Sequence, residues 1–159
     1  MSAEDCPVCC RPSRIVGSMT TPRLRPATLA DLPRILKVRH GTIENRGSDP
    51  ALISDAEVAW YMDEAIFLVF EDETNVQGFI CANHQTGYVW ALFVIHEAQW
   101  RGHGTALLDA AMTRLREAGH QQAFLSTSRG TKAEEFYRAR GSHPTGTNLK
   151  GELVFRLLL

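Results

Sequence analysis

The sequence lacks any stretch that could cross a membrane. No apolar run in it approaches the roughly 20 residues that a spanning helix needs. The first residues also lack the apolar stretch of roughly 7–15 residues that marks a secretory signal. These two absences favour a cytoplasmic protein with no membrane partner.

The sequence also lacks an excess of charge of either sign. Its 17 Lys and Arg residues oppose 18 Asp and Glu residues, which leaves a formal net charge of −1. A protein that binds the phosphates of nucleic acid usually carries a basic surplus. We therefore expect no nucleic acid partner.

Cysteine is scarce and unevenly placed. Three of the four cysteines, Cys6, Cys9 and Cys10, lie in one short segment near the N-terminus, and Cys81 lies in a predicted strand. A structural zinc site needs four ligands, and the nearest further candidate, His40, falls on a predicted helix. We therefore expect no metal site.

The remaining composition is that of one globular domain. The 159 residues are 44% hydrophobic and 22% charged, and a chain of this size buries roughly 70% of the surface that it exposes when unfolded. No periodic apolar pattern precedes Met19. We expect residues 1–18 to be a flexible tail (a natural extension, an upstream mis-start or an expression remnant) and residues 19–159 to form a single domain.

Apolar periodicity after Met19 predicts strands and helices in alternation. Thr28 with Asp31, and Ser54 with Glu57, have the spacing of a capping box, which marks the start of a helix in each case. The other predicted elements are strands at 23–25, 66–70, 76–83, 88–95, 123–127 and 152–159 and helices at 103–118 and 131–140. This order, with hairpins first and a β-α-β unit after them, is typical of an α+β fold.

The most informative segment runs from Gln99 to Thr105. It lies between a predicted strand and a predicted helix and contains Gly102 and Gly104. The first turn of a helix has unpaired N–H groups and a partial positive charge, and glycine there lets a bulky anion approach the main chain. This pattern favours a phosphate or pyrophosphate ligand, with Gln99 and Arg101 as side-chain donors. A plain tight turn between strand and helix is the alternative.

Two other nucleotide-binding motifs do not fit this segment. A P-loop requires Gly-Lys-Ser/Thr, but Gly104 is followed by Thr105 and Ala106. The dinucleotide-binding fingerprint requires a third glycine, and Leu107 stands at that position. A nucleotide-hydrolysing domain is therefore disfavoured.

Two motifs resemble those of a known family. Leu92-Phe93-Val94, Gln99-x-x-Gly102-x-Gly104 and Leu107-Leu108 resemble in sequence the acyl-CoA-binding signature of the GNAT N-acetyltransferase superfamily. Downstream, Ala133-x-x-Phe136-Tyr137-x-x-x-Gly141 is similar to that family's next motif. The resemblance implies an α+β fold with a mixed, mostly antiparallel central sheet. About four helices would flank the sheet, and a splayed strand pair would hold the acyl-CoA.

The resemblance also implies acetyl-CoA as the cosubstrate and a role for each motif. The pantetheine arm would pair with the strand at Phe93 and Val94, and a backbone N–H near Val94 would stabilise the oxyanion. Tyr137 would protonate the departing thiolate as general acid, with a core tyrosine beside Phe136 as the structural alternative. The residues that would bind the pyrophosphate are Gln99, Arg101, Gly102, His103, Gly104 and Thr105.

The sequence departs from the family pattern where a general base is often found. Many members carry a carboxylate before the strand leucine, and Trp90-Ala91 stands there instead. A lysine-type amine has a pKa of about 10.4 and must lose a proton before it attacks the thioester. Glu44, His84 and an ordered water are the remaining candidate bases, and a solvated surface group is the alternative reading of each side chain. Two further departures are Gly130 in place of an Asn that contacts CoA and His96 in place of a proline.

The acceptor is the least defined part of the interpretation. The resemblance places the acceptor site on the loop after the first helix, the second helix and the later hairpins, with Arg46 and Trp90 as candidate substrate-binding residues. We expect acetyl transfer from acetyl-CoA to a primary amine of a small molecule or a protein. A catalytically weak CoA-sensing or partner-binding module is the alternative, and a homodimer stays open.

Overall fold

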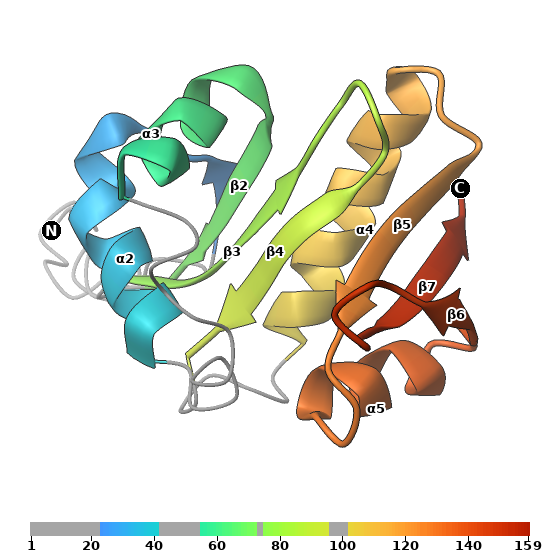
Figure 1. Ribbon diagram of the computed structural model, residues 1–159. Helices are drawn as coiled ribbons and strands as arrows, with labels where there is room; N and C mark the ends of the chain where they lie inside the picture. The colour runs from blue at the N-terminus through green and yellow to red at the C-terminus, as the bar shows by residue number, and fades with distance from the viewer. Residues whose placement is uncertain (1–22, 42–54, 73–74, 96–101) are drawn as a thin grey trace, which may run out of the picture.

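The computed structural model describes residues 23–41, 55–72, 75–95 and 102–159 (Figure 1). The described part contains a four-stranded sheet, a three-stranded sheet and four α-helices. The predicted tail over residues 1–18, with three of the four cysteines, lies outside it. No described helix is both long enough and apolar enough to span a bilayer.

The first sheet has the strand order β1-β2-β3-β4, and every neighbouring pair is antiparallel. Its strands are rich in β-branched and aromatic residues, which suit a pleated, buried surface. They are β1 (Arg23–Pro26), β2 (Ile66–Glu71), β3 (Val76–Ala82) and β4 (Val89–Val94). The register of β3 and β4 shifts between Cys81 and Ala82, so that Trp90 is an extra residue on β4.

The second sheet has the order β5-β7-β6 and is also antiparallel. It consists of β5 (Gln122–Thr127), β6 (Pro144–Thr147) and β7 (Leu153–Leu158). The sequence pattern did not predict strand β6. Pro144 has no N–H to donate and Gly146 has no side chain to pack, so this edge strand carries none of the usual signals.

The two sheets meet at β4 and β5, which run parallel and are connected by α4 (His103–Glu117). In the described residues, a single bridge, Tyr88 to Phe124, joins the amino ends of the two strands. The Phe124 N–H donates to the Gly87 carbonyl there at 3.0 Å. No ladder pairs follow along the described strands, so β4 and β5 are splayed toward their carboxyl ends. The β-α-β unit and the splayed strand pair predicted from the sequence are confirmed.

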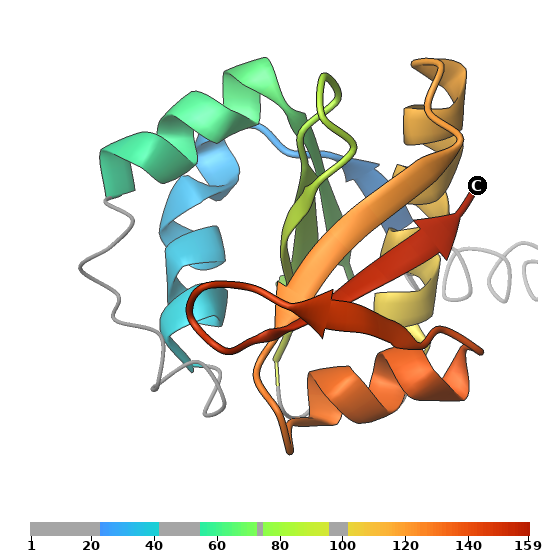
Figure 2. The ribbon, with the colours of Figure 1, turned by 45° about the vertical axis from the view of Figure 1, so that its right-hand side comes forward.

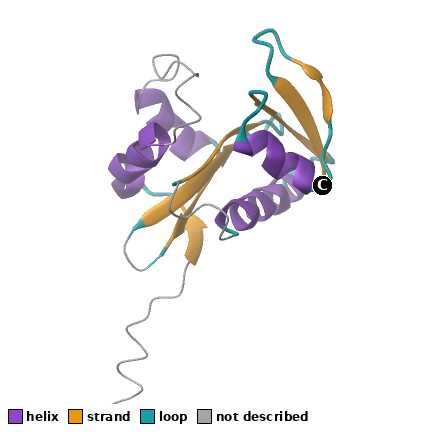
Figure 3. Ribbon diagram, turned by 90° about the horizontal axis from the view of Figure 1, so that it is seen from below, coloured by secondary structure: helices purple, strands orange, loops and turns teal. Residues whose placement is uncertain are grey.

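Helices cover both faces of the first sheet (Figure 3). Helices α2 (Leu32–Gly41) and α3 (Asp55–Glu64) lie on one face, and α4 lies on the other. A 3-10 turn, η3 (Leu29–Asp31), precedes α2, and the Asp31 carboxylate accepts the Thr28 N–H at 2.8 Å. The capping prediction at Thr28 is therefore confirmed, although the first turn is 3-10 rather than α.

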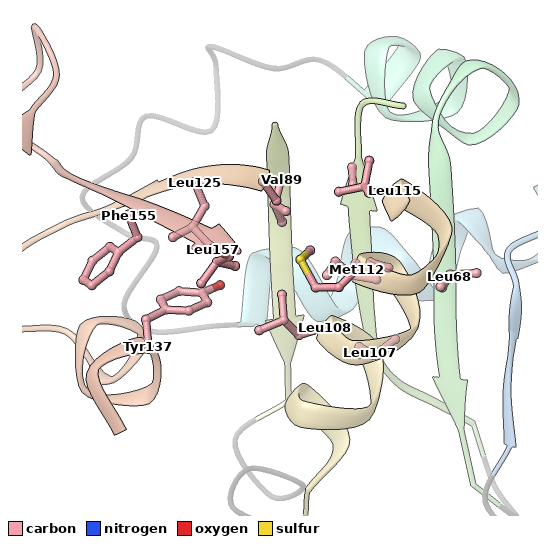
Figure 4. Close-up of a cluster of buried hydrophobic side chains, with 14 of the residues drawn as sticks. Leu68, Val89, Leu107, Leu108, Met112, Leu115, Leu125, Tyr137, Phe155 and Leu157 are labelled. Atoms are coloured by element: carbon pink, nitrogen blue, oxygen red, sulfur yellow. The ribbon is translucent and has the colours of Figure 1, made fainter. Parts of the chain in front are cut away.

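The larger hydrophobic core lies between α4 and both sheets (Figure 4). The α4 side chains Leu107, Leu108 and Leu115 are at most 1% exposed, and burial of each contributes about 1.5–3 kcal/mol. This core includes Leu125 and Phe155 from the second sheet. One core therefore joins the two sheets on the side where their backbone pairing ends.

Helix α5 (Lys132–Ala139) follows β5 and carries the second predicted motif. Thr131 caps its start, with its hydroxyl oxygen accepting the Glu134 N–H at 3.2 Å. The amino ends of α4 and α5 and the carboxyl end of β4 lie together at the lower end of the view in Figure 1.

Candidate active site

The predicted anion site lies at the first turn of α4. Gly102 is the N-cap and has φ +84°, a left-handed conformation that glycine adopts without strain. Its carbonyl accepts the Ala106 N–H at 3.0 Å, which is the first hydrogen bond of the helix. The N–H groups of Gly104 and Thr105 precede that bond, and among the described residues none accepts a hydrogen bond from them. This arrangement suits an anion at the end of the helix.

Side chains close to this turn point away from the anion position. The His103 ring is buried and stacks on Phe70 of β2 with its centroid 4.1 Å away. A Cβ added at Gly102 would meet no atom of a described residue within 4 Å. An anion would therefore meet backbone N–H groups here rather than the His103 side chain. Gln99 and Arg101, the predicted side-chain donors, lie outside the described residues.

Gly104 marks the point where α4, β4 and α5 meet. A Cβ added there would lie 3.8 Å from Cγ2 of Val94 and 3.7 Å from the Phe136 ring. The anion-binding turn, the strand that would hold the pantetheine and the helix that carries Tyr137 are thus neighbours. This closeness could not be read from the sequence, in which Val94 and Phe136 are far apart.

The backbone of β4 offers polar groups on its side away from β3. The Ile95 N–H donates to the Gln77 carbonyl of β3 at 2.9 Å. In an antiparallel ladder the N–H groups alternate in direction, so Phe93 also faces β3, while Leu92 and Val94 face the splay. The predicted contact at Val94 is therefore oriented suitably, and the Phe93 backbone is engaged with Phe79. Leu92, which the sequence analysis did not assign a role, faces the same way as Val94.

Tyr137 lies in the large core with only 5% of its surface exposed. Its ring packs against Phe136 and Phe155, with centroids 5.1 and 5.6 Å away. The hydroxyl points toward Leu108 and Leu157 (Figure 4), and no described residue forms a hydrogen bond with it. Burial raises the pKa of this hydroxyl, so it is protonated at neutral pH.

The described residues among those predicted for the acceptor side, Trp90 and His84, lie away from the first turn of α4 and from Tyr137. Trp90 is half-buried and stacks on Tyr61 of α3 at 4.7 Å, and the Arg39 guanidinium lies 5.8 Å from the same ring. His84 is exposed in the turn before β4, where its carbonyl receives a hydrogen bond from the His120 ring. Glu44 and Arg46 lie outside the described residues. Trp90 is thus on the α2–α3 side of β4, and His84 is beyond its amino end.

One polar chain near the splay was not anticipated from the sequence. The Tyr88 hydroxyl lies 2.9 Å from the Ser126 hydroxyl, which donates to the Glu152 carboxylate at 3.0 Å. The Asn148 amide donates to the same carboxylate oxygen at 2.8 Å. These residues are far apart in the chain, and only the pairing of β5 with β7 brings them together. The only signal for this polar chain in the sequence is Ser126, a polar residue in a strand where buried apolar residues alternate with others.

No described cluster of His, Cys, Asp or Glu could hold a metal ion. Cys81 is fully buried, and burial raises the pKa of its thiol to about 12. A thiol with so high a pKa carries little thiolate at neutral pH, so this side chain is a core residue rather than a nucleophile.

Comparison with protein families identifies one match. Residues 33–141 match the model described as the acetyltransferase (GNAT) family. A search of curated proteins found no match.

Several solved structures have a similar fold. PaiA N-acetyltransferase from Thermoplasma acidophilum, solved with coenzyme A, is 16% identical with a TM-score of 0.78, covering 88% of this chain and 100% of its own. YncA from Salmonella typhimurium, described as a putative acetyltransferase with acetyl-CoA, is 18% identical with a TM-score of 0.72, covering 88% and 95%. The ribosomal-protein-S18-alanine N-acetyltransferase from Escherichia coli is 14% identical with a TM-score of 0.70, covering 87% and 94%.

Proposed function

Because the chain belongs to the GNAT family of acetyltransferases, we propose that it transfers an acetyl group from acetyl-CoA to a primary amine. The observation that carries this proposal is the meeting of three elements at Gly104. The first turn of α4, the carboxyl end of β4 and the helix that bears Tyr137 lie within van der Waals distance there. Two of the similar structures were solved with coenzyme A or acetyl-CoA.

The first turn of α4 would bind the pyrophosphate. Backbone N–H groups and the partial positive charge of a 15-residue helix both favour an anion at this end. The conformation of Gly102 opens the turn, and Gln99 and Arg101 are proposed as further donors. Since the anion lies beyond the carboxyl end of β4, the linear pantetheine arm would run back along β4 toward the bridge at Tyr88.

The edge of β4 would hold the arm and the thioester. The N–H groups of Leu92 and Val94 are directed at the splay, where an extended chain can pair with them. When the amine attacks the thioester carbonyl, negative charge develops on the oxygen, and a fixed N–H near Val94 would stabilise it.

Tyr137 would complete the reaction as general acid. The hydroxyl is protonated at neutral pH and has no described hydrogen-bond partner, so its proton can pass to the thiolate when the carbon–sulfur bond breaks. The aromatic packing of the ring holds the hydroxyl in one direction. The Tyr137 side chain would thus act on a species that exists only late in the reaction.

The test is acetyl-CoA turnover with a panel of primary amines. We expect free thiol to be released only when a suitable amine is present, and the acetylated amine to appear in equal amount. Incubation without amine is the control for simple hydrolysis. Tight acetyl-CoA binding with no amine-dependent thiol release across a broad panel would instead support a CoA-sensing module.

A further inference from the structure

Two successive side-chain hydrogen bonds join Tyr88, Ser126 and Glu152, and the donor of each can be assigned. A carboxylate only accepts, so the single hydroxyl proton of Ser126 points at Glu152. The Ser126 oxygen must then accept from Tyr88, which donates across the 2.9 Å contact. These hydrogen bonds fix the position of the carboxylate, which lies at the base of a surface hairpin.

A second set of bonds fixes Glu152 from the β6–β7 turn. The Asn148 amide donates to Glu152 Oε2 at 2.8 Å, and its carbonyl oxygen accepts the Glu152 N–H at 3.0 Å. Ser126 donates to the same oxygen, Oε2. Among the described residues, no donor reaches Oε1, and no lysine, arginine or histidine forms an ion pair with this carboxylate. Oε1 of the Glu152 carboxylate could therefore bind an incoming cation.

Strand register places Glu152 at the height of the proposed thioester position, with β5 between β4 and β7. The bridge pairs Tyr88 with Phe124, and Trp90 is an extra residue on β4, so four steps further along these parallel strands Phe93 is level with Ser128. On the other side of β5, Thr127 pairs with Leu153, which puts Glu152 opposite Ser128. Glu152 and Phe93 are therefore at the same height along the splay.

Glu152 also lies on the face that coenzyme A would leave open. Ala123 and Leu125 of β5 are buried in the α4 core, so Ser126, one residue further, faces the opposite side. In Figure 2 the turn between β6 and β7 extends away from α4, and α5 lies below the β6–β7 hairpin. An acceptor that enters from this side would meet the thioester without passing the anion site.

We propose that Glu152 is the acceptor-site base, which binds the ammonium form of a cationic primary amine and takes its proton. This inference rests on the proposed acetyl transfer. It supplies, from the residue before β7, the carboxylate that β4 lacks at Trp90-Ala91.

The reaction then balances as follows. An N–H bond of the ammonium breaks and its proton goes to Glu152, leaving an electron pair on nitrogen that forms the bond to the thioester carbon. The carbon–sulfur bond breaks, and the thiolate takes the proton of Tyr137. One of the two protons that remain on the positively charged nitrogen passes to the Tyr137 oxygen, the other stays as the amide N–H, and Glu152 releases its proton to solvent.

The substrate class follows from this chemistry. A carboxylate at the amine position favours acceptors with a positive charge and repels those with an acidic group next to the amine. The dependence on Glu152 grows with the pKa of the acceptor, because a less acidic ammonium is deprotonated less often by water.

The decisive variant is Glu152→Gln. The glutamine carbonyl can still accept from Ser126 and Asn148, so the hairpin keeps its hydrogen bonds while the charge and the proton acceptor are lost. We expect kcat/KM at neutral pH to fall about 10²-fold for n-butylamine, a lysine-type amine with a pKa of about 10. For a peptide α-amine with a pKa of about 8 the fall should be less than about tenfold. Acetyl-CoA affinity and melting temperature should match those of Glu117→Gln, which removes the same charge at the distant end of α4.

A binding measurement separates this inference from the proposed function. NMR titration with n-butylammonium, on the protein with coenzyme A bound, should show weaker binding by about tenfold in Glu152→Gln. If the wild type transfers acetyl groups and Glu152→Gln equals it on both amines, Glu152 is only a hairpin residue and the inference is wrong. If the wild type transfers nothing but binds n-butylammonium through Glu152, acetyl transfer fails and the cation site stands. If it neither transfers nor binds, both are overturned.

Discussion

Tyr137 has the two properties that a proton donor needs at neutral pH, a proton and a fixed direction. Burial raises the pKa of its hydroxyl, and packing against Phe136 and Phe155 fixes the ring. The same packing is what an ordinary core tyrosine would show. A substitution that keeps the ring and removes the hydroxyl therefore separates the two interpretations.

We predict that Tyr137→Phe lowers kcat and kcat/KM together by about 10²-fold. Acetyl-CoA affinity should hardly change, because the hydroxyl acts on a thiolate that is absent from the ground state. Stability should also hold, since no described hydrogen bond is lost. Single-turnover kinetics and calorimetry measure the two effects. Full turnover in the variant, with chemistry rate-limiting, would make Tyr137 a core residue.

The anion site can be tested by comparing valine substitutions at Gly102 and Gly119, which lie at opposite ends of α4. Gly102→Val should abolish acetyl-CoA binding, because a β-branched side chain would stand where the pyrophosphate binds. The left-handed φ of +84° also makes the substitution strained, at a cost of about 1–2 kcal/mol. Gly119, at the other end of α4, has φ +99° and open space around it. Gly119→Val should therefore lose similar stability and keep full affinity by calorimetry, and equal affinity in both variants would contradict the anion site.

At the scale of elements, charges tie β1 to the helix start that follows it. Arg25 forms a two-pronged pair with Asp31 at 2.8 and 2.9 Å and reaches Glu71 of β2 at 2.8 Å. The Arg25 guanidinium and the Thr28 N–H lower the pKa of Asp31 to about 2. The ionised carboxylate thus stabilises the folded state at neutral pH.

This shift gives Asp31 a defined pH dependence. A folded-state pKa below the unfolded value of about 3.9 contributes stability that is complete above that value and is lost as pH falls toward 2. We predict that Asp31→Asn costs about 1–2 kcal/mol at pH 7 and that the difference from wild type narrows below about pH 4. Urea unfolding at several pH values measures it. Asp63→Asn, at an exposed position on α3, is the control and should show no such narrowing.

Local signals were enough to predict most elements of the fold, and the anion site stays a prediction. Capping pairs, apolar periodicity and the two glycines are read within a few residues, and the strands and helices that they predict are present. Edge strand β6 was missed, because Pro144 and Gly146 form a strand only by pairing with β7. The Glu152 site was missed for the same reason. Its hydrogen bonds join residues 26 and 38 positions apart, and no local pattern marks such partners.

At the scale of the whole molecule, residues 1–18 are proposed to contribute nothing to the domain. A chain that starts at Met19 should match the full chain in melting temperature and in acetyl-CoA affinity, because the removed residues follow no apolar periodicity. Differential scanning calorimetry compares the two. Stoichiometric zinc in the long form, with destabilisation by a chelator, would show instead that the cysteine segment folds.

The two sheets share one core, and within the described ranges a single backbone bridge joins them, so a ligand in the splay should act on the stability of the whole domain. Acetyl-CoA would contact β4 and α4 on one side and α5 on the other, and it has no site in the unfolded chain. At a concentration of 100 times Kd it would add about 2.7 kcal/mol, which for a domain of this size raises Tm by roughly 5–10 °C. We expect one cooperative transition that moves to higher temperature with coenzyme A, no shift in Gly102→Val and no shift with ATP and magnesium. A shift with ATP and magnesium but none with coenzyme A would assign the glycine turn to a nucleotide and overturn the acetyl-CoA site.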